Sequence, residues 1–519
     1  MSRIYSYDTT LRDGAQCEGV SFSCDDKLDI LRRLDAFGMD FVEGGWPGSN
    51  PRDDEFFAKA ADLDLKRTSL TAFGSTRRSG TRSENDTNLR NLAACPAEWC
   101  CIFGKSWDFQ AREALGISPE DNLTLIEDSV SFLVSKGKRV MFDAEHFFDG
   151  YVSSRDYAIA AIRAAERGGA EWAVLCDTNG GMLPGRIAAA CSDALSSLEI
   201  PVGIHCHNDS DLATANSLAA VDAGCTMVQG TVNGMGERCG NANLCTVLPD
   251  LSLKCGMDIG RIDLTGLTGL SISIGEIANM APSPGMPFVG YRAFAHKGGM
   301  HVSALVKDPK TYEHVGPETV GNSRRILVSD MAGRASISEK LKELGLEAGS
   351  DSPEITRLIK EMESKGYEFE GADASFKLLV RRLRGDLVER FSVDAFRIFM
   401  DSRGSGMDSE ASVKVRGVDG DVEHTAADGN GPVNALDNAI RKALESFYPE
   451  LRRIRLTDYK VRVLDEKSAT AASVRVLIRS TDGEHSWTTV GVSVNVIEAS
   501  LIALVDSMEY ALMKQEERA

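Results

Sequence analysis

An apolar strand that ends in two histidines occupies Pro201-Val202-Gly203-Ile204-His205-Cys206-His207-Asn208-Asp209. Side chains alternate across a β-strand, so His205 and His207 are expected on one face and Cys206 on the other. Two imidazoles at a fixed separation suit a divalent metal ion, because imidazole binds first-row metals well. Such a pair is also compatible with simple packing or hydrogen bonding, and residues elsewhere in the chain must decide between these interpretations.

Short apolar or β-branched segments of this kind recur through the first half of the chain. They lie at residues 4–7, 41–43, 67–73, 99–103, 139–142, 172–176, 201–207 and 227–232. The segments between them, such as residues 27–34 and 213–223, carry leucine, isoleucine or alanine at helical spacing. Eight strand–helix units within roughly 250 residues predict a parallel (β/α)8 TIM barrel rather than an open doubly wound sheet.

Composition restricts the classes of function. The chain has 519 residues, enough for several domains, and a net charge of −19, which argues against binding to nucleic acid or to an anionic membrane surface. All 12 cysteines lie between Cys17 and Cys255, a distribution unlike that of a secreted disulfide framework. The sequence shows neither a leader pattern nor an apolar run of membrane-spanning length. We therefore expect reduced thiols and a soluble, cytoplasmic protein.

Polar clusters follow seven of the eight expected strands. They lie at residues 8–16, 43–45, 104–106, 143–146, 177–180, 205–209 and 233–241. Each cluster alone is compatible with a turn or a flexible loop. Because the carboxyl ends of the strands meet at one mouth of a TIM barrel, the set as a whole predicts a shared active site there.

Three of these clusters carry a resemblance to a known family. The chain resembles the α-isopropylmalate, homocitrate and citramalate synthases, which are related to HMG-CoA lyase, in DTTLRDG at 8–14, HCHND at 205–209 and GMGERCGN at 234–241. HKGGMH at 296–301 is similar to the subdomain motif of that family, and the C-terminal stretch to its regulatory domain. The resemblance implies an α/β chain with a catalytic barrel at 1–270, helical linker subdomains at 271–392 and a C-terminal α/β regulatory and dimerisation domain at 393–519.

The resemblance also implies a set of metal ligands. These are Asp13, His205, His207 and Asn241. In this family a divalent ion (manganese, magnesium or zinc) is chelated by the keto oxygen and the carboxylate of a 2-oxo acid and acts as a Lewis acid, with acetyl-CoA as the second substrate.

Catalytic roles follow from the same resemblance. Arg12 is expected to stabilise negative charge on the substrate and enolate oxygens, the alternative being a structural salt bridge. Glu145 is expected to take part in proton transfer, and Thr178 to bind the carboxylate of the 2-oxo acid. His301, with Tyr312, is expected to reach the site from the partner subunit as a general base or proton relay, which requires a homodimer.

The phosphates of CoA need local cations or amides in so acidic a chain. The candidates near the strand ends are Lys105, Gly234, Gly236, Gly240 and Arg238. A purely structural ion pair made by Glu237 is an equally good interpretation of the glycine-rich loop.

The identity of the 2-oxo acid that accepts the acetyl group is inferred from two loops. RDGAQ at 12–16 and EGGWPGSNP at 43–51 look like a citramalate-forming subgroup, which joins acetyl-CoA, pyruvate and water to give (R)-citramalate and CoA for isoleucine synthesis, with isoleucine as the inhibitor. The alternatives are formation of 2-isopropylmalate from 2-oxoisovalerate for leucine synthesis, the reverse cleavage by a lyase, and a non-catalytic amino-acid sensor. A pocket that separates these acceptors differs by a few methylene groups, worth about 1–3 kcal/mol.

The last third of the chain predicts a separate α/β domain. Alternation places Ala411, Val413 and Val415 on one face of a strand, and Val461 and Val463 on another strand. A glycine turn at 429–431 precedes a helix with proline in its first turn, and an apolar-faced helix is expected at 498–513. By resemblance this domain binds an inhibitory amino acid, or else serves only in dimerisation.

Overall fold

Eight parallel strands form a closed barrel in which each strand pairs with its neighbour in chain order and β8 returns to β1. The strands are β1 (Tyr5–Asp8), β2 (Phe41–Gly45), β3 (Ser69–Ser75), β4 (Trp99–Lys105), β5 (Arg139–Glu145), β6 (Trp172–Asp177), β7 (Val202–Cys206) and β8 (Met227–Gly230). The predicted fold class, an α/β chain with an N-terminal TIM barrel and a C-terminal α/β domain, is confirmed.

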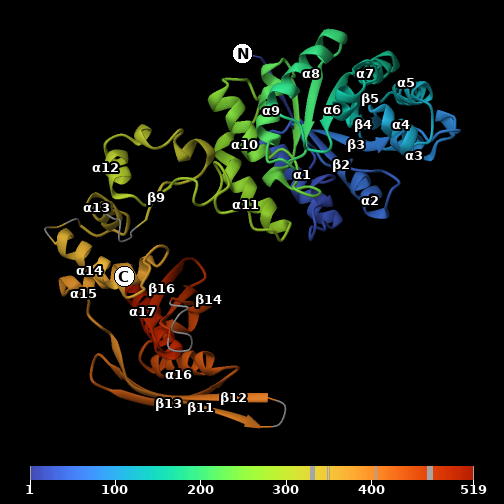
Figure 1. The fold of residues 1–519 in the computed structure, drawn as a ribbon. Helices are drawn as coiled ribbons and strands as arrows, with labels where there is room; N and C mark the ends of the chain where they lie inside the picture. The colour runs from blue at the N-terminus through green and yellow to red at the C-terminus, as the bar shows by residue number, and fades with distance from the viewer. Residues whose placement is uncertain are drawn as a thin grey trace. The chain divides into compact units, whose positions relative to one another are not determined.

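Helices cover the outside of the barrel (Figure 1). They are α1 (Cys24–Phe37), α2 (Pro51–Ala60), α3 (Thr87–Ala94), α4 (Asp108–Glu113), α5 (Pro119–Ser135), α6 (Phe147–Ser153), α7 (Arg155–Gly168), α8 (Pro184–Ser197), α9 (Ala213–Asp222), α10 (Leu244–Pro249) and α11 (Leu267–Ile277). Local sequence explains their limits. α1, for example, begins at a capping box between Ser23 and Asp26 and ends at Gly38, whose φ of 103° suits glycine.

The interior of the barrel is packed mainly with side chains from its strands. Its buried members are Tyr7, Phe41, Phe73, Trp99, Cys101, Met141, Trp172, Val174 and Met227. This apolar cluster occupies much of the interior, and the polar side chains lie toward the carboxyl ends of the strands.

The structure, a computed structural model, describes residues 2–327, 334–347, 349, 351–403, 406–464 and 472–517, and these divide into two units. The first unit is Met1–Phe294 with Val315–Ser323, and the second is Ala295–His314 with Arg324–Ala519. The segment 271–392, expected to form linker subdomains, is therefore shared between the two units. Within the described parts of the chain, no helix has both the length and the apolar character needed to cross a bilayer.

The second unit starts with short elements and ends in two antiparallel sheets. The short elements are β9 (Ala295–His296), α12 (Gly299–Lys307), β10 (Arg325–Ile326), α13 (Arg334–Glu343), α14 (Ser352–Ser364) and α15 (Asp373–Arg384). The first sheet, which packs on α16 (Pro432–Phe447), consists of β11 (Phe391–Arg403), β12 (Gly406–Gly417) and β13 (Val422–Gly429). The second sheet, which packs on α17 (Val496–Glu516), consists of β14 (Arg455–Val463), β15 (Val474–Thr481) and β16 (Ser486–Ser493).

The predicted face of Ala411, Val413 and Val415 is buried in the core against α16. Val461 and Val463 do lie on a strand, but their side chains are 46% and 51% exposed. β14 is an edge strand of its sheet, whereas α17 packs on β15 and β16, and this leaves the end of β14 uncovered.

Candidate active site

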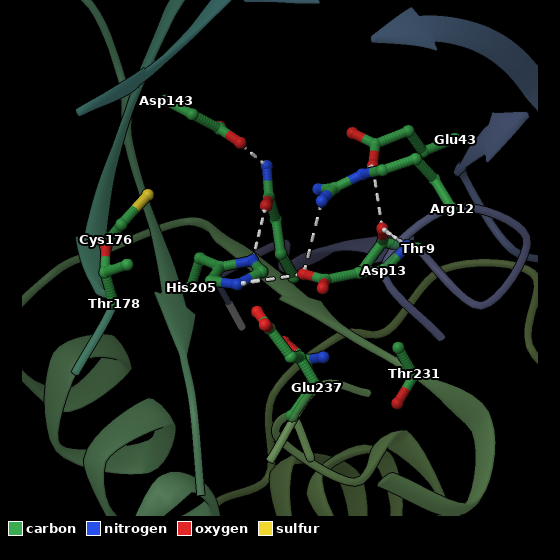
Figure 2. Close-up of polar contacts among 12 residues, drawn as sticks. Thr9, Arg12, Asp13, Glu43, Asp143, Cys176, Thr178, His205, Thr231 and Glu237 are labelled. Atoms are coloured by element: carbon green, nitrogen blue, oxygen red, sulfur yellow. Dashed lines mark hydrogen bonds and ion pairs between the residues drawn. The ribbon is translucent and has the colours of Figure 1, made fainter. Parts of the chain in front are cut away.

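Three predicted metal ligands converge at the mouth of the barrel. Asp13 lies in the loop after β1, His205 lies on β7, and His207 follows the end of that strand. One ligand atom from each lies within 4.8 Å of the others, and all three residues are buried. His205 Nε2 is 3.5 Å from Asp13 Oδ2 (Figure 2), and the two imidazole centroids are 5.1 Å apart. The two histidines and Asp13 therefore lie close enough together to share one bound ion.

The fourth predicted ligand, Asn241, is brought to this cluster by the backbone. His207 and Asn241 form an antiparallel bridge, and the Asn208 amide donates to the Gly240 carbonyl at 2.8 Å. Gly240 has a φ of +89°, and a Cβ there would lie 2.0 Å from the carbonyl oxygen of Gly234. Glycine is therefore required for the loop to fold back and place Asn241 beside His207.

The side chains at this point fit a divalent metal ion. His207 Nδ1 and Asn241 Oδ1 are buried and have no hydrogen-bond partner among the described residues. Buried polar atoms without partners cost free energy, and a bound cation removes that cost at Asn241 Oδ1, which is an acceptor. A carboxylate, two imidazoles and an amide oxygen form a mixed oxygen and nitrogen donor set typical of such ions.

The protonation states also suit metal binding. Burial, together with the charge of His205, lowers the pKa of His207 to about 4. Burial alone would raise the pKa of Asp13, but Arg12 and the two histidines lower it below its ordinary value. A neutral imidazole and an ionised carboxylate are the forms that coordinate a cation.

Arg12 is held between two carboxylates. Its Nε donates to Glu43, and its Nη1 is 3.6 Å from Asp13 Oδ2 (Figure 2). Glu43 is fully buried and also accepts hydrogen bonds from the Tyr7 hydroxyl at 2.6 Å and from Thr9 Oγ1 at 2.7 Å. The salt bridge considered for Arg12 therefore exists, and it holds the guanidinium beside the candidate metal ligands.

Two further residues behind His205 were not assigned a role from the sequence. Gln229 Oε1 lies 2.9 Å from His205 Nδ1, and Gln229 Nε2 donates to Asp143 Oδ1 at 3.1 Å. Burial, followed by the charge of Glu43, raises the pKa of Asp143 to about 6. The only sequence signal for Gln229 is a polar residue inside the apolar strand β8, and for Asp143 its membership of the polar cluster at residues 143–146, toward the carboxyl end of β5.

Thr178 and Glu145 lie at neighbouring strand ends. Thr178 Oγ1 accepts a hydrogen bond from the His146 amide at 2.8 Å. Glu145 on β5 pairs in register with Lys105 on β4, and their side chains form an ion pair. Both predicted residues thus belong to the carboxyl ends of the barrel strands.

The groups expected to meet CoA already have protein partners. Arg238 donates to both carboxylate oxygens of Asp209 at 2.7 and 2.9 Å, and Lys105 is paired with Glu145. The Gly234 amide donates to the Thr231 carbonyl at 3.2 Å. A Cβ at Gly236 would lie 2.2 Å from Asn241 Nδ2, so this glycine permits the close approach of the candidate ligand.

His301 and Tyr312 belong to the second unit, not to the unit that holds the metal cluster. Their rings are stacked with centroids 4.2 Å apart, and both residues are exposed, Tyr312 by 44%.

Comparison with known families gives matches along most of the chain. The HMGL-like family model matches residues 3–268, and a homocitrate synthase post-HMGL domain-like model matches residues 288–367. The LeuA allosteric (dimerisation) domain model matches residues 370–512.

Curated relatives match the chain over nearly its whole length. It is 52% identical to an (R)-citramalate synthase of Aquifex aeolicus, covering 99% of each chain, and 51% identical to one of Geobacter sulfurreducens, covering 100% of this chain and 99% of the relative. It is 31% identical to a 2-isopropylmalate synthase of Methanocaldococcus jannaschii, covering 99% of this chain and 96% of the relative.

Proposed function

The chain belongs to the HMGL-like family and, within it, to the group of the (R)-citramalate synthases. From this premise we propose that it condenses acetyl-CoA with pyruvate. The methyl carbon of acetyl-CoA loses a proton and forms a bond to the keto carbon of pyruvate, whose oxygen gains a proton to become a hydroxyl group, and water then cleaves the thioester. The products are (R)-citramalate and CoA. The protein is accordingly an acyltransferase, and the predicted function agrees with that of its full-length relatives.

The observation that carries the reaction class is the buried cluster of Asp13, His205, His207 and Asn241 next to Arg12. A divalent ion bound there would act as a Lewis acid toward the keto group of the acceptor. Manganese, magnesium and zinc all suit this donor set of two oxygens and two imidazole nitrogens.

Arg12 supports the reaction through its permanent charge. Glu43 holds the guanidinium by its Nε, while Nη1 is directed toward Asp13. A fixed cation at this place favours the negative charge that develops on the acceptor and enolate oxygens. Because the orientation is held by a buried carboxylate, little reorganisation is needed during the reaction.

The remaining roles are proposed from the family resemblance and the position of each residue. Thr178 binds the carboxylate of pyruvate, and Glu145, oriented by Lys105, participates in proton transfer at the methyl group. His301 and Tyr312 are exposed in the second unit, where they are available to the barrel of a partner subunit in a homodimer. Such an arrangement makes the site depend on dimerisation.

CoA is proposed to contact the same side of the barrel. The candidates remain Lys105, Gly234, Gly236 and Arg238. A phosphate of CoA would have to compete with the protein groups that already pair with them. The LeuA-type domain is proposed to bind isoleucine as a feedback inhibitor, and the protein is proposed to act in the cytoplasm in isoleucine biosynthesis.

The acceptor assignment is tested by CoA release from acetyl-CoA with a panel of 2-oxo acids, and by chromatographic identification of the product. We expect pyruvate to have the highest kcat/KM and to give (R)-citramalate. A preference for 2-oxoisovalerate would show a 2-isopropylmalate synthase instead, and absence of metal-dependent turnover with every acceptor would favour a non-catalytic sensor. The same panel with isoleucine or leucine added tests the proposed effector.

A further inference from the structure

His205 has a different neighbour at each ring nitrogen. Nε2 is 3.5 Å from Asp13 Oδ2 and faces the candidate metal site, whereas Nδ1 is 2.9 Å from Gln229 Oε1. His205 is 5% exposed, and Gln229 is fully buried. Since bulk water does not reach this contact, the protein itself must satisfy Nδ1.

Asp143 determines which way the Gln229 amide points. Gln229 Nε2 is 3.1 Å from Asp143 Oδ1, and both residues are buried. The reversed amide would bring a carbonyl oxygen against a carboxylate oxygen, and its NH2 group against His205. The NH2 group therefore donates to Asp143, and the carbonyl oxygen of Gln229 faces His205.

The orientation of the amide in turn selects one tautomer of the imidazole. A carbonyl oxygen can only accept, so Nδ1 of His205 must carry the proton. Whenever this imidazole is neutral, Nε2 therefore keeps its lone pair, directed toward Asp13 and the metal site. A neutral imidazole in solution populates both tautomers, and only this one can donate a lone pair at Nε2.

Within the described part of the chain, His207 has no such hydrogen bond at Nδ1, so the arrangement is specific to His205. The Nδ1 atom of His207 has no hydrogen-bond partner among the described residues, and the residue is placed by its backbone bridge to Asn241. Asp143 is itself held in place, since Cys101 hydrogen-bonds to it. Cys101, Asp143 and Gln229 thus form a chain of hydrogen bonds that ends at Nδ1 of His205.

We infer that Gln229 and Asp143 are positioning residues that lock His205 as its Nδ1–H tautomer, with Nε2 ready to bind the metal. The inference rests on the metal site of the proposed function and adds residues that do not touch the ion. Partners of this kind typically change metal affinity by about 10- to 100-fold when they are removed.

Two measurements on the full-length protein test the inference. The first is the nitrogen chemical shifts of ¹⁵N-labelled histidine in the chelated protein at a pH where the imidazoles are neutral. His205 should show an Nδ1 shift typical of a protonated nitrogen and an Nε2 shift typical of a bare one. In Gln229→Met, which keeps the length of the side chain and removes the amide, the two shifts should move toward those of a tautomer mixture.

The second measurement is the Kd for Mn²⁺, determined from the electron paramagnetic resonance signal of the free ion. Gln229→Met should raise the Kd by about 10- to 100-fold. Asp143→Asn retains an oxygen that accepts from Gln229 and should stay close to the unsubstituted protein, whereas Asp143→Leu should weaken binding as Gln229→Met does. This second pair keeps the test valid if Gln229→Met does not fold.

Asn216→Leu is the matched control. Asn216 is a fully buried amide on α9 of the same barrel, and it donates to the Met182 carbonyl at 2.9 Å rather than to a candidate ligand. Its loss should leave both the His205 shifts and the Mn²⁺ affinity unchanged. Circular dichroism and the thermal midpoint establish that each variant is folded.

The possible outcomes separate this inference from the proposed function. Unchanged shifts and unchanged Mn²⁺ affinity in a folded Gln229→Met protein would overturn the inference alone, and so would equal affinities of Asp143→Asn and Asp143→Leu. Failure of the unsubstituted protein to bind Mn²⁺ would overturn both the metal site and the inference. Mn²⁺ binding with the expected variant pattern but without CoA release would leave the inference standing and contradict the proposed reaction.

Discussion

The metal cluster of the barrel and the His301–Tyr312 pair of the second unit are built in opposite ways. Asp13, His205 and His207 are buried, and each is held by hydrogen bonds, ion pairs or backbone bridges inside one unit. His301 and Tyr312 are exposed and stack on each other. Buried polar groups are preorganised by the fold, whereas an exposed pair acquires a defined role only when a ligand or partner covers it.

This difference separates two kinds of contribution to the reaction. Changes in the barrel should alter metal binding and turnover together, because the donors are one connected set. Changes at the exposed pair should alter turnover without altering metal binding. The predictions below test this separation, beginning with the largest expected effect.

Removal of Asp13 should abolish metal binding and turnover together. Asp13→Ala is expected to lower kcat/KM on the order of 10³-fold or more, about 4 kcal/mol, because the carboxylate ligand is lost. His207→Ala should behave in the same way. The measurement is CoA release, with Mn²⁺ affinity determined in parallel and circular dichroism as the check on folding. Undiminished activity in either folded variant would refute the metal assignment.

Removal of His301 should lower turnover without changing metal binding. His301→Ala is expected to lower kcat by about 10²- to 10⁴-fold, the range for loss of a general acid or base, while the Kd for Mn²⁺ stays the same. Tyr312→Phe keeps the stacked ring and shows how much of the effect belongs to the hydroxyl. A change in Mn²⁺ affinity, or normal turnover in His301→Ala, contradicts the proposed division.

The burial of His207 predicts how stability depends on pH. Its pKa is about 4 in the folded protein, below the ordinary value near 6.5, so the unfolded chain binds the proton more readily between these values. The free energy of unfolding of the chelated protein should therefore fall by about 2 kcal/mol from this residue as the pH drops from about 7.5 to about 5.

Urea unfolding of the unsubstituted protein and of His207→Gln at both pH values measures this contribution. The variant should lose about 2 kcal/mol less stability on acidification. Equal losses in the two proteins would show that the low pKa of His207 does not contribute.

The smallest effect is expected at Arg238. Its exposed guanidinium is already paired with Asp209, so replacing that partner with a phosphate of CoA yields only about 1 kcal/mol. Arg238→Gln should raise the KM for acetyl-CoA by about fivefold and leave the KM for pyruvate unchanged. Arg163→Gln, which alters an exposed arginine on α7, is the control. An unchanged KM for acetyl-CoA removes Arg238 from the proposed CoA contacts.

Much of the barrel could be predicted from the sequence because its strands are buried on both faces and therefore appear as short apolar runs. The limits of the strands were less predictable. The strand predicted at 201–207 ends at Cys206, because His207 turns to form its bridge with Asn241. That bridge joins residues far apart in the sequence, so no local sequence pattern predicts it.

The candidate ligands could be anticipated because their motifs resemble a known family, whereas their supports could not. Nothing in the sequence indicates that Gln229 lies between His205 and Asp143, since the three belong to different strands. In the same way, the sequence shows Lys105 and Arg238 as cations but not the carboxylates that already pair with them. Which polar groups meet inside the barrel depends on strand register, which only the folded structure shows.

Metal dependence of the condensation tests the central claim most directly. Protein freed of metal by chelation is assayed for CoA release from acetyl-CoA and pyruvate before and after Mn²⁺ is added. We predict no release from the chelated protein and restored release with Mn²⁺, accompanied by one (R)-citramalate for each CoA. Turnover at an undiminished rate in the fully chelated protein would contradict the account.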